Sequence, residues 1–184
     1  LEEVQRNAMK INSLIHQVLN FNRIEDNKDS LLILSRIELV SFSRSLFSVY
    51  EEDKRFTFHF EANKAKIYAD MDAIKLGVIL DNLLSNAVKF TPDGGSVRLS
   101  LFYREETGLL DICVSDTGTG IPQQDIPYIF QRFFQSPHSG NKEGTGIGLY
   151  LVKTYTELHG GHINGVTSNE GKGTSIGLNI PVIA

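Results

Sequence analysis

Apolar residues near the amino end of the chain recur alternately four and three positions apart, which is the heptad pattern of a helix that packs along one seam. A polar stretch at residues 25–30 interrupts the pattern, and its composition predicts a short linker. We therefore expect residues 1–27 to form one heptad-patterned helix with its linker, and residues 28–184 to form a separate domain. The seam comprises Val4, Ala8, Ile11, Ile15 and Val18, and it is widened by Leu14, Leu19 and Phe21.

Beyond the linker, strand-like and helix-like patterns alternate irregularly. Phenylalanines alternate with polar residues around 56–61, as in a half-buried strand, and residues 66–69 are expected to pair with it. Residues 96–103 and 109–115 predict an antiparallel pair. This order favours a two-layer α/β sandwich, with a mixed, mostly antiparallel sheet against helices, over repeated parallel βαβ units. Further strands are expected at 31–37, 162–168 and 173–180, and helices at 39–51, 71–90, 123–134 and 146–159.

Composition narrows the range of partners. The 184 residues are 41% hydrophobic, enough for one packed core plus an accessory element, and the net charge is −4. Because no long basic run occurs, nucleic acid is disfavoured as a partner. No window of 18 apolar residues occurs, so we expect a soluble piece without membrane contact. The single cysteine, Cys113, lies in an alternating run, and we expect a buried strand thiol in a reducing, cytoplasmic setting.

Three polar residues on the predicted helix 71–90 share one face. Asn82, Asn86 and Lys89 fall at positions i, i+4 and i+7. Mg²⁺ binds through a few protein oxygens plus substrate phosphates, so one amide oxygen, from Asn86, suffices as its protein anchor. Lys89 would bring a positive charge to the phosphates. The alternative is a solvated helix face with incidental asparagines, and the neighbouring motifs favour the nucleotide interpretation.

An acidic residue followed by glycines ends the predicted strand 109–115. Asp116 precedes Gly118 and Gly120, which leave space for a flat ring close to the backbone. A carboxylate accepts a hydrogen bond from an exocyclic amine, which adenine has, whereas guanine presents a carbonyl at that position. The pattern therefore favours ATP over GTP. Taken alone, the motif favours a plain Asp-Gly turn.

A second glycine cluster opens the predicted helix 146–159. Unpaired N–H groups at the start of a helix, together with its dipole, favour phosphate oxygens. The spacing is not that of a P-loop, and it also departs from the dinucleotide-binding fingerprint. The alternative is a glycine loop without a ligand. The cluster consists of Gly144, Thr145, Gly146, Ile147, Gly148 and Leu149.

Together these motifs resemble the ATP-binding domain of bacterial sensor histidine kinases, in the GHKL or Bergerat superfamily. The resemblance covers nearly the whole chain and implies the Bergerat ATP-binding fold. Residues 82–90 resemble the N box of the family, residues 130–134 its F box, and residues 116–120, 144–149 and 171–174 its glycine boxes.

The resemblance implies a role for each matching residue. Asn86 holds Mg²⁺ and Asp116 binds the adenine amine, while Lys89 and Arg132 approach the triphosphate. Phe90 borders the nucleotide, and Thr174 lies near the base. Residues 135–143 are expected to form a lid over the terminal phosphate, with Lys142 as a charged contact.

Position 82 separates the branches of this superfamily. The ATPase branches carry a glutamate general base one helical turn before the magnesium asparagine, and here that position is Asn82. Because an amide cannot accept a proton at neutral pH, we expect phosphoryl transfer to an outside acceptor rather than hydrolysis. A clamp-type ATPase and a non-catalytic nucleotide-binding module are the alternatives.

The amino-terminal helix resembles the second helix of the dimerisation and phosphoacceptor hairpin of the family. His16 lacks the acidic residue and the Arg-x-Pro segment that follow the acceptor histidine, so we expect the acceptor to lie on a helix outside this chain. A response regulator receiver domain and a homodimer of a probably membrane-associated bacterial sensor are the implied partners. His159 is expected to act as a cation at a helix end rather than as a zinc ligand.

Overall fold

The structure, a computed structural model, describes residues 31–137 and 144–182. The heptad-patterned helix and its linker, including His16, lie outside the described residues, as does Lys142. The expectations for these residues therefore stay predictions.

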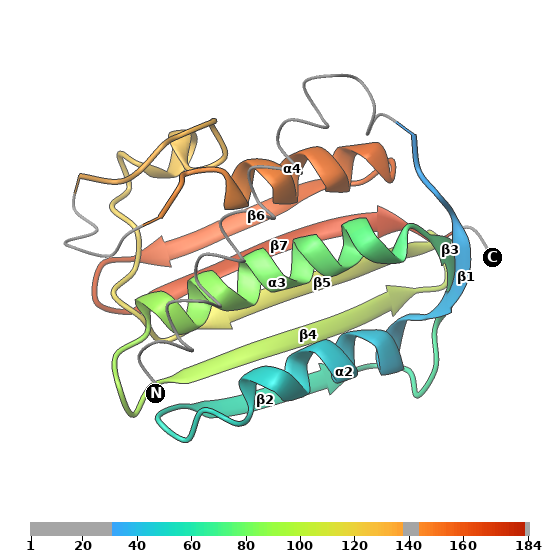
Figure 1. Ribbon diagram of the computed structural model, residues 1–184, viewed down its shortest axis with the longest axis horizontal. Helices are drawn as coiled ribbons and strands as arrows, with labels where there is room; N and C mark the ends of the chain where they lie inside the picture. The colour runs from blue at the N-terminus through green and yellow to red at the C-terminus, as the bar shows by residue number, and fades with distance from the viewer. Residues whose placement is uncertain (1–30, 138–143, 183–184) are drawn as a thin grey trace, which may run out of the picture.

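One mixed sheet of five strands forms the back layer of the molecule (Figure 1). In spatial order its strands are β2 (Thr57–Ala62), β4 (Ser96–Arg104), β5 (Leu109–Asp116), β7 (Gly173–Pro181) and β6 (His162–Asn169). The β2–β4 pair is parallel, and the other neighbouring pairs are antiparallel. The predicted mixed, mostly antiparallel sheet is confirmed.

Helices α2 (Leu39–Tyr50), α3 (Ala73–Phe90) and α4 (Gly148–Leu158) lie side by side over one face of this sheet (Figure 1). Each helix turns its apolar stripe to the strands below it, because burying that stripe is the main source of helix stability in a folded domain. The predicted two-layer sandwich is therefore confirmed. Its core includes Leu76, Leu80, Leu83 and Leu84 of α3, Val97, Leu99 and Leu101 of β4, Leu110, Ile112 and Val114 of β5, and Ile176, Leu178 and Ile180 of β7.

A separate two-stranded sheet joins β1 (Ser35–Glu38) to β3 (Tyr68–Met71). The predicted pairing of residues 66–69 with the strand around 56–61 is wrong, because Tyr68 pairs with Glu38 and Met71 with Ser35. The carboxylate of Glu38 explains part of this choice. It accepts from the backbone N–H of Ile67 at 3.0 Å while it caps α2, and thereby fixes β3 beside β1.

The predicted helix at 123–134 is reduced to a short 3₁₀ turn, η1 (Ile126–Tyr128). Pro127 lies in the middle of the predicted helix, where its ring prevents an intrahelical hydrogen bond. The rest of this segment is irregular and contains Phe133, whose φ of 60° is rare for a residue with a side chain.

Cys113 lies on the face of the sheet away from the helices. Its neighbours Ile112 and Val114 point into the core, so strand alternation turns the thiol outward, where it is half-buried. Its Sγ lies 3.2 Å from Oγ of Ser175. The prediction of a buried strand thiol is therefore wrong about the face.

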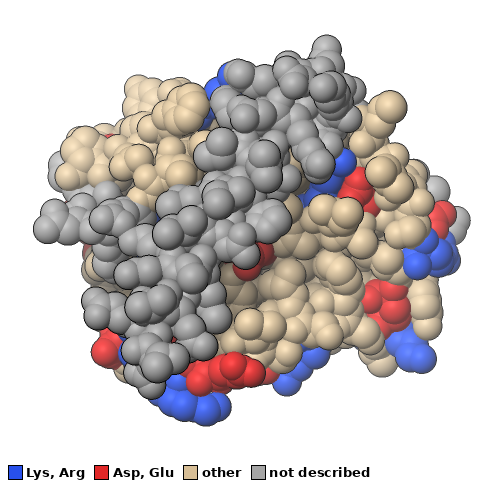
Figure 2. Space-filling model, in the orientation of Figure 1, with Lys and Arg blue, Asp and Glu red and all other residues tan. Residues whose placement is uncertain are grey.

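Charges of both signs are interspersed on the surface. On the face shown in Figure 2, basic and acidic side chains lie next to one another along the lower and right-hand edges. Exposed pairs such as Lys64–Glu105, at 2.8 Å, are of the kind that contributes little to stability. Within the described ranges, no helix combines the length and hydrophobicity needed to cross a membrane.

A buried polar network ties the start of α3 to the end of α4. Asp72 caps α3 by accepting from the backbone N–H of Lys75 at 3.0 Å, and its second oxygen accepts from the ammonium of Lys75 at 3.1 Å. Burial alone would raise the pKa of Asp72, but the hydrogen bonds from Lys75 and from the N–H of Ile33 hold it below its ordinary value. The carboxylate is therefore ionised and paired.

His159 completes this network as a neutral ring. Its Nε2 accepts from the backbone N–H of Asp72 at 3.2 Å, so Nδ1 carries the proton and donates to the carbonyl of Tyr155 at 2.7 Å. Burial lowers the pKa of His159, against the opposing influence of these partners. The predicted position of His159 at the end of α4 is confirmed. The expected positive charge is wrong, because Nε2 accepts from the backbone N–H of Asp72 and therefore carries no proton.

Replacing Asp72 by alanine is expected to lower the free energy of unfolding at pH 7 by about 3–5 kcal/mol, because it removes the cap of α3 and the carboxylate that pairs with the buried ammonium of Lys75. Since the folded pKa of Asp72 lies below its ordinary value of 3.8, this stabilisation is present above pH 3.8 and is lost as the pH falls through the folded pKa. Urea denaturation across this pH range checks both statements. The exposed Asp93→Ala variant is the control, and equal losses in the two variants would contradict the assignment.

Candidate functional site

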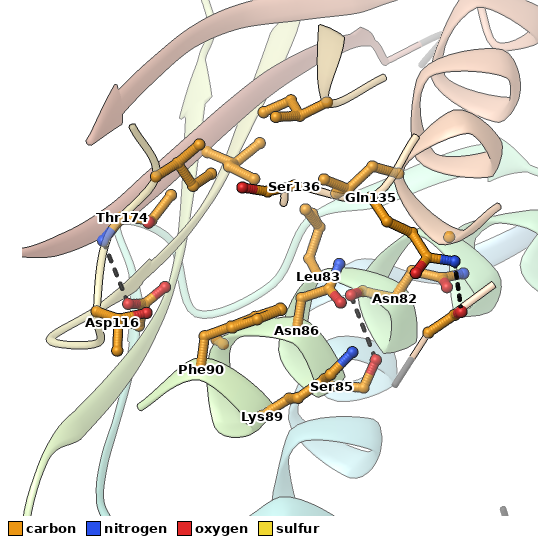
Figure 3. Close-up of a pocket in the computed structure, with 18 of the residues that line it drawn as sticks. Asn82, Leu83, Ser85, Asn86, Lys89, Phe90, Asp116, Gln135, Ser136 and Thr174 are labelled. Carbon is orange, nitrogen blue, oxygen red and sulfur yellow. Dashed lines mark hydrogen bonds between the residues drawn. The ribbon is translucent and has the colours of Figure 1, made fainter. Parts of the chain in front are cut away.

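A cavity of about 530 Å³ lies between α3, the start of α4 and the adjoining ends of β5 and β7 (Figure 3). This volume is within the usual range for sites that hold small molecules and cofactors. The cavity brings together motifs that are far apart in the sequence. The predicted site residues that line it are Asn82, Asn86, Lys89, Phe90, Asp116, Gly120, Gly144, Thr145, Gly146, Gly148, Leu149 and Thr174.

The polar face of α3 forms one wall. Asn82 is buried against α4: its Nδ2 donates to the carbonyl of Val78 at 2.8 Å, and a Cβ placed on Gly148 would meet its Oδ1 at 2.5 Å. Asn86, one turn later, is half-buried and lines the cavity. Lys89 reaches across toward the glycine segment, since a Cβ on Gly144 would lie 3.1 Å from its Nζ. A positive charge therefore stands at this end of the cavity.

A partly buried carboxylate stands at the other end. Oδ1 of Asp116 accepts from the backbone N–H groups of Gly118 at 2.8 Å and Thr174 at 3.2 Å. Burial raises the pKa of Asp116 above its ordinary value, and the two hydrogen bonds only partly oppose this shift. Since both contacts within the described residues involve Oδ1, Oδ2 is the oxygen left to accept from a ligand.

Close backbone packing fixes this carboxylate. Gly118 lies under it, where a Cβ would come within 2.6 Å of the carbonyl oxygen of Phe90. Gly173 has a φ of 90°, and a Cβ there would lie 1.9 Å from the carbonyl oxygen of Asp116. No residue with a Cβ would fit at either position, so both must be glycine. Gly118 itself does not line the cavity. Its lack of a side chain leaves room for the carboxylate of Asp116.

Among the described residues, no side chain caps the start of α4. Glu38 and Asp72 cap α2 and α3 with their carboxylates, whereas Ile147 precedes α4 and supplies no such hydrogen bond. The first N–H groups of a helix need partners, and an anion is a suitable one. Gly146, with a φ of 71°, turns the chain into this helix beside the cavity. The geometry therefore fits a phosphate group here.

The segment after η1 closes the third side. The amide of Gln135 donates to the carbonyl of Gly144 at 2.9 Å, and the N–H of Phe133 donates to the carbonyl of Gly146 at 3.0 Å. Ser136 also lines the cavity and donates to the carboxylate of Asp125. Sequence reasoning gave Gln135 and Ser136 only a place in the expected lid at residues 135–143. Neither residue belongs to a motif, and only the folded backbone brings them to the glycine segment.

Arg132 does not line the cavity. Its guanidinium carbon lies 5.0 Å from the centre of the Tyr150 ring, and its Nη2 donates to the Tyr150 hydroxyl at 3.1 Å. It lies instead beside Lys153 and Glu157, in a shallow groove on the outer side of α4. Arg132 therefore lies outside the group of predicted site residues that the cavity brings together, and its expected approach to a triphosphate stays a prediction.

The lining suits a hydrated metal ion better than a protein-built metal site. Across the described ranges, no group of three or more His, Cys, Asp or Glu side chains is arranged to hold a metal. The oxygen of Asn86 would therefore be joined mainly by oxygens of the ligand and of water, which is the coordination that Mg²⁺ favours. The residues fit a magnesium nucleotide with its phosphates near Lys89 and its base near Asp116.

The comparisons with known proteins agree with this geometry. Residues 71–183 match the family described as "Histidine kinase-, DNA gyrase B-, and HSP90-like ATPase". The chain is 34% identical over 181 residues to the sensor histidine kinase WalK of Bacillus subtilis, covering 96% of this chain and 29% of that protein. The chain thus spans less than a third of the length of this relative.

Solved structures show the same fold. A mycobacterial sensor histidine kinase, MprB, superposes with a TM-score of 0.69 at 28% identity, over 82% of this chain and 98% of that one. Full-length ShkA in complex with AMPPNP superposes with a TM-score of 0.80 at 26% identity, over 95% of this chain and 36% of that one.

Replacing Asp116 by asparagine is expected to weaken binding of adenine nucleotides by roughly 10- to 100-fold, the loss expected for a hydrogen bond to a charged group. The new amide keeps an acceptor for Gly118 and Thr174 but turns a donor toward the adenine amine. Titration calorimetry with ATP and with GTP checks this. The ratio of the two affinities should fall, because the variant loses affinity mainly for ATP.

The same variant should not lose stability at neutral pH. Because burial raises the pKa of Asp116, its ionised form is disfavoured in the folded state above pH 3.8, and removing the charge relieves that cost. The Asp93→Asn variant is the control. Unchanged ATP affinity, or unfolding of the Asp116 variant, would contradict this account.

Proposed function

Because this chain belongs to the histidine kinase-, DNA gyrase B- and HSP90-like ATPase family, as a catalytic ATP-binding domain of the sensor histidine kinase type, we propose that it transfers the γ-phosphate of Mg-ATP to a histidine on a helix outside this chain. One observation carries the proposal. A single cavity has a carboxylate at one end and, at the other, a lysine beside a helix start that lacks a side-chain cap.

Each lining residue then has a defined role. Oδ2 of Asp116 accepts from the adenine amine, and Thr174 and Phe90 border the base. Asn86 would hold Mg²⁺, which when bound neutralises part of the phosphate charge. The backbone N–H groups at Gly146, Gly148 and Leu149 bind phosphate oxygens. These roles are supported by the position of each residue along the cavity.

The transfer itself is an in-line displacement. A lone pair on an imidazole nitrogen of the acceptor attacks the γ-phosphorus, a P–N bond forms, and the P–O bond to the β-phosphate breaks with ADP leaving. Lys89 stabilises the charge that gathers on the transferred group and on the leaving oxygen. Phosphoryl transfer of this kind depends on positioning and charge more than on proton abstraction.

Asn82 supports transfer over hydrolysis. Its amide cannot act as a base. Nδ2 donates to the carbonyl of Val78, and Oδ1 lies so close to Gly148 that a Cβ there would come within 2.5 Å of it. A water molecule in the cavity would therefore lack an activating group at this position. Arg132 is not among the residues that line the cavity, and its guanidinium lies over the ring of Tyr150.

The whole protein is proposed to work in two-component signalling. Its own phosphoacceptor helix would receive the phosphoryl group and pass it to a receiver domain of a response regulator. The sensor histidine kinases to which the chain is similar support this assignment. A homodimeric parent and a cytoplasmic location of this domain are part of the same proposal.

Incubation with Mg-ATP labelled at the γ-phosphate and a longer form of the protein that carries the acceptor helix tests the proposed reaction. We expect acid-labile, alkali-stable label on histidine, and little steady-state phosphate release by the 184-residue chain alone. Tight nucleotide binding without transfer would favour a binding module, and rapid phosphate release would favour an ATPase.

The Asn86→Ala variant tests the metal assignment. We expect at least about a tenfold loss of ATP affinity in the presence of Mg²⁺, and much less change in the presence of EDTA, because the lost group acts through the metal. The fold should be unaffected, since Asn86 lies off the apolar stripe of α3. Titration calorimetry measures both affinities, and equal losses with and without metal would reject the role.

A further inference from the structure

A buried carboxylate behind the cavity wall has no role in the proposed transfer. Asp125 is only 7% exposed and directly precedes the turn η1. Its carboxylate accepts from the hydroxyl of Ser136, and Ser136 lines the cavity. Burying a carboxylate is costly unless it is hydrogen-bonded, so the contact with Ser136 calls for an explanation.

The backbone holds Asp125 in place on both sides. Its N–H donates to the carbonyl of Pro122 at 2.9 Å, and its own carbonyl accepts from the N–H of Tyr128, also at 2.9 Å. Pro122 and Ser136 both line the cavity, so Asp125 connects two segments of the cavity wall. The direction of the Ser136 hydroxyl is therefore fixed from behind the wall.

A hydroxyl held in this way meets a ligand as an acceptor. It has one hydrogen and two acceptor lone pairs, and the hydrogen of Ser136 points to Asp125. A matching ligand offers a hydrogen-bond donor at this point of the cavity. ATP carries donors on the amine of its base, which is assigned to Asp116, and on the hydroxyls of its ribose.

The place of Ser136 along the cavity selects the ribose. In Figure 3, Ser136 lies between Asp116 on one side and Gln135 on the other. Under the proposed function the base lies near Asp116, and the phosphates lie near Lys89 at the opposite end. Because the ribose joins the base to the phosphates, it lies in the middle of the cavity, where Ser136 is found.

We propose that Ser136, oriented by Asp125, accepts a hydrogen bond from a ribose hydroxyl and makes the site prefer ribonucleotides over nucleotides that lack sugar hydroxyls. The inference rests on the proposed function, from which it takes the orientation of the nucleotide. Ser136 then determines specificity for the sugar, and Asp125 is a positioning residue that acts through it.

The test compares ATP with 2′,3′-dideoxy-ATP, by titration calorimetry with Mg²⁺ on the 184-residue chain. We expect the unmodified chain to bind ATP about 3- to 10-fold more tightly than the dideoxy form, which is the range for one hydrogen bond between neutral groups. In the Ser136→Ala variant this ratio should fall to about one, because the affinity for ATP drops to that for the dideoxy form. The Ser136→Thr variant keeps the hydroxyl and should restore the ratio.

Ser85→Ala is the matched control. Ser85 also lines the cavity, but its hydroxyl donates to the carbonyl of Asn82 on α3, so its loss should leave the ratio unchanged. The Asp125→Ala variant should lower the ratio although Ser136 remains, with folding checked by circular dichroism. An unchanged ratio in the folded Asp125→Ala variant would overturn the positioning role.

The possible failures are distinguishable. Equal affinities for the two nucleotides in the unmodified chain, or an undiminished ratio in the Ser136→Ala variant, would overturn the assignment of Ser136 and leave the proposed function standing. A chain that binds neither nucleotide would contradict the proposed function itself, and this inference with it.

Discussion

The site depends on how α3 is fixed in the fold. The apolar stripe of this helix must lie on β4 and β5, and that requirement sets its rotation about its own axis. This rotation places the polar face of α3, with Asn82, Asn86 and Lys89, on the flank that faces the start of α4. Asp72 fixes the position of the helix along its axis by capping the first turn. Core packing and one buried carboxylate thus place the polar wall of the cavity before any ligand is present.

Much of this arrangement was predictable because it follows from periodicity and from glycine. Spacing placed Asn82, Asn86 and Lys89 on one helix face, and the end of an apolar strand marked Asp116. The glycines at 118, 146 and 173 were marked as parts of the glycine motifs, and the structure has close backbone contacts at each of them, at distances that no side chain would allow. The two-layer fold followed from the irregular order of strands and helices.

What sequence reasoning missed was decided by long-range contacts. The partner of residues 68–71 is set by Glu38, far away in the chain, and the protonation of His159 is set by the N–H of Asp72. The outward direction of Cys113 and the stacking of Arg132 on Tyr150 likewise depend on neighbours that only the folded chain supplies. Pro127 is different, because its effect on the helix expected at 123–134 was legible in the sequence.

The uncapped start of α4 has a consequence for the working cycle. Where other helices complete their hydrogen bonding with a protein carboxylate, this one would borrow its missing acceptor from the nucleotide. Filling and emptying the cavity is then also the completion and the opening of a helical turn. Each round of nucleotide binding and release would therefore order and loosen the backbone near Gly148. A diphosphate left behind after transfer would keep this turn only partly closed.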